Sequence, residues 1–139
     1  MIGFGLGGVI FGITGPILEE LGLNSTREGI MVLGSMLVWM RVFIAMTAGI
    51  TEEILLRTYP IERLKEWSGN IWLAALRAFV IFVLLHLPFW SLGGTIQIGL
   101  ATLIWTLIYI KTRSLWTMII MHCVNDLFAF VMLPNFFAS

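Results

Sequence analysis

Charged residues are scarce in this chain of 139 residues: they make up 12% of it, whereas a soluble domain averages about 25%. Hydrophobic residues, by contrast, make up 59%. A soluble domain of this size cannot bury so much apolar surface, which excludes a water-soluble enzyme and a DNA-binding domain. The composition therefore predicts a protein whose partner is the lipid bilayer.

The chain also lacks an excess of charge of either sign, with eight basic and eight acidic side chains. Without a basic patch, we expect no nucleic acid among its partners. Cys123 is the only cysteine, so no disulfide can form within the chain. The N-terminus has no basic segment of the kind found in cleaved signal peptides, and we expect residues 1–139 to form a single membrane domain.

What the chain has instead is a series of long apolar runs. A spanning helix needs about 20 predominantly apolar residues. Five segments reach or approach that length: 2–18, 30–57, 71–90, 92–110 and 115–133. The predicted fold is all-α, a polytopic transmembrane helix bundle of about five spans.

Basic residues in the connections predict an orientation. Segment 58–70 reads as an amphipathic stretch that ends in a turn, and segment 111–114 as a short loop. The basic residues of these two connections are Arg63, Lys65, Lys111 and Arg113. The loops of the opposite side contain only Arg27, so the positive-inside rule places 58–70 and 111–114 in the cytoplasm. We expect a multi-pass protein of the cell membrane in a prokaryote, or of the endoplasmic reticulum in a eukaryote.

The apolar segments contain ionisable residues, which are costly in a membrane helix and usually mark function. Glu53 and Arg57 are four residues apart and predict an ion pair. Glu52 is turned by about 100° from Glu53. We expect its face to carry small or apolar residues: Ala45, Ala48, Gly49 and Leu56. A carboxylate without a cation on its face is suited to be a general base, although a charged helix end at the headgroups is the alternative.

Both histidines of the chain lie in apolar segments. His86 follows Phe82 by one helical turn, and a single histidine in such a helix is more often structural than catalytic. His122 has Asn125 three residues on and Asp126 one turn on, so either can orient its ring or stabilise its charge.

The expected depths of these residues disagree. His122 and Glu52 lie at similar distances from the cytoplasmic ends of their helices, about 10 Å for His122, whereas His86 would lie about 22 Å in if its helix begins at Ile71. Either that helix begins later or tilts, or the preceding helix continues past Arg57.

Taken in order, Glu52-Glu53-x-x-x-Arg57, Phe82-x-x-x-His86 and His122-x-x-x-Asp126 resemble the three motifs of the CPBP family, over about residues 45–130. This family comprises the type II CAAX prenyl endopeptidases and the Abi, or bacteriocin-processing, proteins. The resemblance implies an intramembrane, glutamate-protease-like hydrolase without a cofactor, acting on a membrane-associated protein or peptide.

The resemblance also implies roles for individual residues. Glu52 would activate a water molecule together with His86, and His122 with Asp126 would stabilise the oxyanion. The supporting residues would be Phe82, Asn125, Glu53 and Arg57, the last two holding the helix.

One position departs from the common pattern, because the family often has asparagine where this chain has Asp126. An ionised aspartate only accepts hydrogen bonds, so either Asn125 supplies the amide or Asp126 is protonated.

Three alternatives stay open at this point. Glu52, His86, His122 and Asp126 could be zinc ligands, since carboxylate and imidazole suit that ion. The chain could instead be a non-proteolytic scaffold or bacteriocin-immunity protein of the same family. A small transporter with a proton relay is a further hypothesis, although no inverted repeat is visible in the sequence.

Overall fold

The computed structural model describes residues 2–137, with side chains for residues 7–135, and this part of the chain is all-α, as predicted. Its elements in chain order are α1 (Ile2–Glu20), α2 (Thr26–Gly34), α3 (Val38–Glu52), the π-helix η1 (Glu53–Thr58), α4 (Tyr59–Ser68), α5 (Ile71–Thr112), α6 (Leu115–Leu127), the π-helix η2 (Phe128–Met132) and α7 (Leu133–Phe137).

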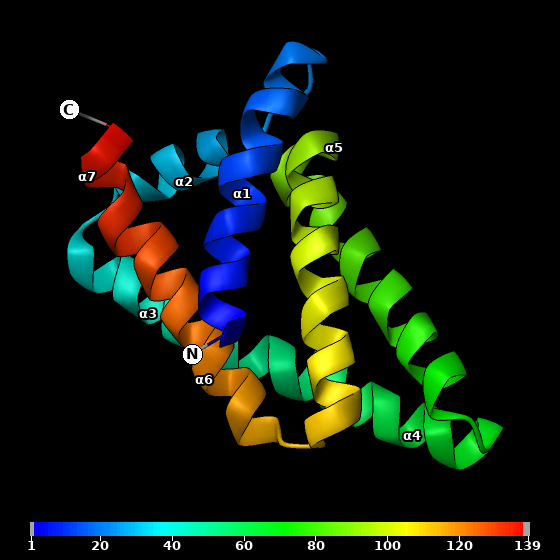
Figure 1. The fold of residues 1–139 in the computed structure, drawn as a ribbon. Coiled ribbons are helices and arrows are strands. Elements are labelled where there is room, and N and C mark those ends of the chain that lie inside the picture. The colour runs from blue at the N-terminus through cyan, green and yellow to red at the C-terminus, as the bar shows by residue number, and fades with distance from the viewer. Residues whose placement is uncertain (1, 138–139) are drawn as a thin grey trace.

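Helix α5 consists of two helices joined at Ser91, whose backbone has φ 61° and ψ 175°. In Figure 1 the chain rises along the green part of α5 and returns along the yellow part beside it. The Ser91 hydroxyl donates to the carbonyl of Asn24, which ties this turn to the α1–α2 loop. The predicted segments 71–90 and 92–110 are confirmed as two helices that meet at Ser91.

The prediction of one helix over 30–57 is wrong at both ends. The chain leaves helical geometry after Gly34 and begins α3 at Val38, because Gly34 and Ser35 are weak helix formers. At its other end α3 continues through η1 and α4 to Ser68 without a break. Pro60 has no N–H to donate to the carbonyl four residues earlier in the helix. The helix has a wider turn just before it, in which the backbone N–H of Tyr59 donates to the carbonyl of Ile54.

The helix–turn arrangement predicted for 58–70 is confirmed, since α4 ends at Gly69 with φ 67°. A core of Ile61, Ala74, Ala75, Ala78, Trp105, Tyr109 and Met118 joins α4, both parts of α5 and α6. At its edge the Tyr109 hydroxyl donates to Glu62 at 2.6 Å, and Arg113 forms an ion pair with the same carboxylate. This core fixes α4 against the lower end of the bundle (Figure 1).

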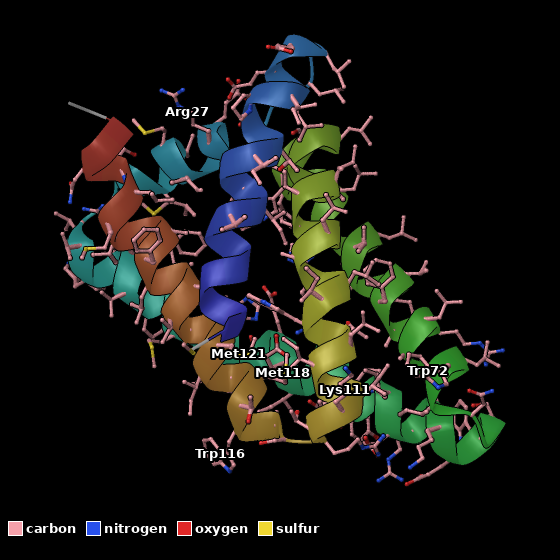
Figure 2. All side chains as sticks on the ribbon, viewed as in Figure 1. Arg27, Trp72, Lys111, Trp116, Met118 and Met121 are labelled. Atoms are coloured by element: carbon pink, nitrogen blue, oxygen red, sulfur yellow. The ribbon has the colours of Figure 1, made fainter. Side chains whose placement is uncertain are left out.

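Two of the described helical stretches are long and apolar enough to be candidate membrane spans, Ile71–Thr112 and Leu115–Asn135. The connections on either side of the first part of α5 lie at opposite ends of the molecule. Figure 2 shows Arg27 at one end and Lys111 and Trp116 at the other.

Candidate active site

The site is built around a buried ion pair in η1. Glu53 is 0% exposed and its Oε1 lies 3.0 Å from Nη1 of Arg57, which is 2% exposed. The predicted pair four residues apart is therefore present. Because both charges are out of contact with solvent, each depends on the other for stabilisation.

Glu53 also fixes one of the histidines. Its Oε1 lies 2.7 Å from Nδ1 of His122 on α6, and an ionised carboxylate can only accept, so Nδ1 carries a proton. The contact requires α3 and α6 to lie very close. A Cβ on Gly49 would be 2.5 Å from Sγ of Cys123 and 2.9 Å from its backbone N, so the absence of a side chain at Gly49 permits this approach.

Glu52 faces a different environment from its neighbour and is 25% exposed. Its Oε2 lies 3.5 Å from Nε2 of His86 and 3.9 Å from Nε2 of His122. Of the small and apolar residues expected on the face of Glu52, Ala45 and Gly49 are buried by packing against neighbouring helices. Ala48 and Leu56, by contrast, line the same cavity as Glu52.

His86 is held by its own helix. Nδ1 lies 2.8 Å from the carbonyl oxygen of Phe82, and since a carbonyl only accepts, this nitrogen carries a proton as well. The imidazole stacks on the Phe82 ring with centroids 4.5 Å apart. The mismatch in depth is resolved because α5 does begin at Ile71 while the preceding helix continues past Arg57.

Asp126 lies one turn beyond His122, and its Oδ2 is 3.4 Å from Nε2 of that histidine. The side-chain amide of Asn125 donates to the other oxygen of Asp126 at 3.2 Å. Nε2 of His122 therefore lies near two carboxylates, Glu52 and Asp126, while Glu53 occupies its other nitrogen.

A cavity of about 1040 Å³ connects these groups. The residues of the site that line it are Glu52, Phe82, His86, Trp105, His122, Asn125 and Asp126. Most of the remaining wall is apolar and comes from α1, α2, both parts of α5 and η2. The acidic and imidazole groups thus meet at one water-accessible space inside an apolar bundle.

This arrangement can activate water. The Nδ1 atoms of His86 and His122 each donate a hydrogen bond. Their Nε2 atoms face Glu52 and can accept a hydrogen bond, or donate one if they are protonated. The separations of 3.5 and 3.9 Å are longer than normal hydrogen bonds but too short for a water molecule to lie between the atoms, so a water bound by Glu52 and an imidazole would lie beside them, in the cavity.

Two residues that line the cavity, Trp105 and Gln97, lie outside the three sequence motifs. Trp105 contacts His122, with ring centroids 5.1 Å apart. Gln97 is 1% exposed and accepts from the backbone N–H and hydroxyl of Thr26, while its amide donates to Thr14. An isolated glutamine in an apolar run is the signal that could have identified Gln97.

The zinc alternative receives no geometric support, since no group of three or more His, Cys, Asp and Glu side chains between residues 7 and 135 is arranged to hold a metal ion. Arg41, the other buried arginine among the described residues, lies away from the site. It donates to the carbonyl of Phe130 at 3.2 Å. This carbonyl lacks its usual helical partner, because Pro134, four residues later, has no N–H.

Comparison with known protein families gives one match. A family model described as type II CAAX prenyl endopeptidase Rce1-like matches residues 34–128, more than half of the chain. The matched range contains all three motifs and ends shortly after Asp126. No match was found among curated proteins or among solved structures.

Proposed function

Because the chain belongs to the Rce1-like family of type II CAAX prenyl endopeptidases, we propose that it is an intramembrane endopeptidase that hydrolyses a peptide bond with a water molecule activated by Glu52. The observation that carries the proposal is the convergence of Glu52, His86 and His122 on one cavity. The substrate would be a membrane-associated protein or peptide.

In the proposed mechanism, a water bound in the cavity beside Glu52 and His86 gives a proton to the carboxylate as its oxygen attacks the scissile carbonyl. The resulting oxyanion is stabilised by a donor on the opposite side of the carbonyl. His122 can serve there from Nε2 as an imidazolium, since Glu53 and Asp126 supply negative charge on both sides of its ring. Glu52 then returns the proton to the leaving amine.

Asp126 enters this mechanism through His122. An ionised Asp126, 3.4 Å from Nε2, stabilises the positive charge of His122 while the Nε2–H itself donates to the oxyanion, and the amide of Asn125 is the nearby neutral donor. A protonated Asp126 would act as a donor itself. Substituting Asp126→Asn distinguishes these roles, because an amide keeps a donor and removes the charge.

We further propose that the protein crosses the membrane several times, with 58–70 and 111–114 in the cytoplasm. The two candidate spans support this, as does the division of the first of them into two helices at Ser91. The active site would then open to water between lipid-facing helices.

The test is cleavage of a membrane-anchored peptide library by the purified protein in liposomes. We expect Glu52→Gln to lower the cleavage rate by about 10²–10⁴-fold, the usual contribution of a general base, without changing the melting temperature. Glu66→Gln is the matched control, since Glu66 is 57% exposed and pairs with Arg63 at the surface.

Cleavage by Glu52→Gln at the wild-type rate would remove this residue from the mechanism. Loss of activity on chelation, restored by zinc, would favour the metal-dependent alternative. A stable partner whose binding survives Glu52→Gln, with no cleavage by the wild type, would favour a scaffold.

A further inference from the structure

The guanidinium of Arg57 lies between two aromatic rings. Its Cζ is 5.1 Å from the centroid of Phe82 and 5.6 Å from the centroid of Trp105, both within the range of a cation–π contact. All three side chains are buried, with Trp105 4% exposed. In the absence of water, such contacts are stronger than at a surface.

Each of these rings also contacts one imidazole of the site. Phe82 stacks on His86 with centroids 4.5 Å apart and planes 25° apart. Trp105 meets His122 with centroids 5.1 Å apart and planes at 59°. The two histidines are thus each linked to the same buried cation through one aromatic ring.

Polar contacts hold one nitrogen of His122 firmly and the other less firmly. Nδ1 lies 2.7 Å from Oε1 of Glu53, whereas Nε2 lies 3.4 Å from Oδ2 of Asp126 and 3.9 Å from Oε2 of Glu52, both longer than a normal hydrogen bond. The direction of Nε2 therefore also depends on what the ring plane packs against. Trp105 is the aromatic ring in contact with that plane.

We propose that Trp105 is a positioning residue, which holds the His122 ring so that Nε2 faces Glu52, as Phe82 does for His86. The second part of α5 supplies none of the ionisable groups described in the site. Through Trp105 it sets the orientation of one of them, the imidazole of His122. The kinetic consequence of this inference rests on the proposed function, whereas the orientation of the ring does not.

The test uses the fact that the chain contains two histidines. Selective ¹⁵N-histidine labelling of the full chain in lipid gives separate imidazole signals for His86 and His122. We expect Trp105→Leu to shift or broaden the His122 signals and leave those of His86 in place. Phe82→Leu should do the reverse.

Trp116→Leu is the matched control, because Trp116 is 73% exposed and the same ring is lost at the surface. Trp105→Phe keeps an aromatic ring and should shift the His122 signals in the same direction by less, which provides a second reading if Trp105→Leu does not fold. His122 signals that stay at their wild-type positions in both Trp105 variants would overturn the proposal. Equal changes at His86 and His122 would also overturn it, because they would indicate a general loss of structure.

Activity gives an independent readout. A misplacement of about 1 Å can cost about 10²-fold in rate, so Trp105→Leu should lower kcat to this extent with KM little changed, and Trp105→Phe should restore most of it. Equal kcat values for Trp105→Leu and wild type would contradict the kinetic part. If the wild type itself cleaves nothing, the proposed function fails while the histidine signals still decide the role of Trp105.

Discussion

Glu52 and Glu53 are adjacent in the chain, yet they differ in exposure and partners. Glu53 is fully buried between Arg57 and His122 and has no contact with the cavity. Glu52 is partly exposed, lines the cavity and faces two imidazoles. Burial therefore commits one carboxylate to holding the structure, and exposure to the cavity leaves the other free to exchange protons with water.

The burial of the Glu53–Arg57 pair predicts unequal losses of stability for two arginine substitutions. Arg57→Met leaves the buried carboxylate of Glu53 without its cation, and removal of one partner of a buried pair typically costs about 3–5 kcal/mol. We expect a clear fall in melting temperature in detergent. Arg63→Met removes an exposed pair with Glu66 and should cost at most about 1 kcal/mol. Equal melting temperatures for the two variants would show that the Glu53–Arg57 pair has no structural role.

At the scale of the element, the π-helix η1 keeps the buried face of the long helix in line. Positions 45, 49, 53, 57 and 61 are all buried. In a regular α-helix each four-residue step drifts by about 40°, so position 61 would lie about 160° from position 45. The wider turn ahead of Pro60 offsets this drift, and the same face can pack against α6 above and α5 below.

Gly49 sets the distance between α3 and α6, and hence the reach from Glu53 to His122. Gly49→Ala places a methyl group within 2.5 Å of Cys123 Sγ and 2.9 Å of its backbone N, and the backbone cannot yield without moving α6. We expect a loss of about 1–3 kcal/mol in stability and a lower cleavage rate.

Gly12→Ala is the matched control for this substitution, since a Cβ there meets no atom within 4 Å. It should be neutral or slightly stabilising, because alanine favours a helix over glycine. A Gly49→Ala protein as stable and active as the wild type would show that the close approach is not required.

At the scale of the whole molecule, the cavity exists only because several helices surround it. Figure 1 shows α1 beside α6 and the second part of α5. Through Gly8, Phe11 and Gly12, α1 lines the same cavity as the site residues, although it lies outside the range matched by the family. The cavity therefore depends on helices inside and outside the matched range.

Filling the cavity from α1 tests whether substrate occupies it. Gly12→Leu projects an apolar side chain into open space, and we expect kcat/KM to fall by about tenfold through KM, in line with the usual effect of small size changes in a pocket. Ile13→Phe adds bulk to an exposed position of the same helix and should have no effect. Unchanged kinetics for Gly12→Leu would place the substrate elsewhere.

The orientation of the bundle is tested by labelling single cysteines in sealed vesicles, in a Cys123→Ala background. Lys111→Cys should react with a membrane-impermeant maleimide from the cytoplasmic side, and Arg27→Cys from the opposite side, because basic residues concentrate in cytoplasmic loops. Labelling of both positions from the same side would contradict the proposed topology.

The sequence by itself determined the features that depend on local spacing and composition. These are the helical class, the separate apolar segments 71–90 and 92–110, the Glu53–Arg57 pair and the placement of Phe82 one turn before His86. Each follows from the helix repeat or from residues that break it.

Only the tertiary structure decided which face of the long helix is buried, since the π turn before Pro60 changes the register of that face and the close approach at Gly49 packs it against α6. It also decided that Trp105 reaches His122 and that α1 lines the cavity. These contacts join residues far apart in the chain, and helix periodicity carries no information about which helices become neighbours.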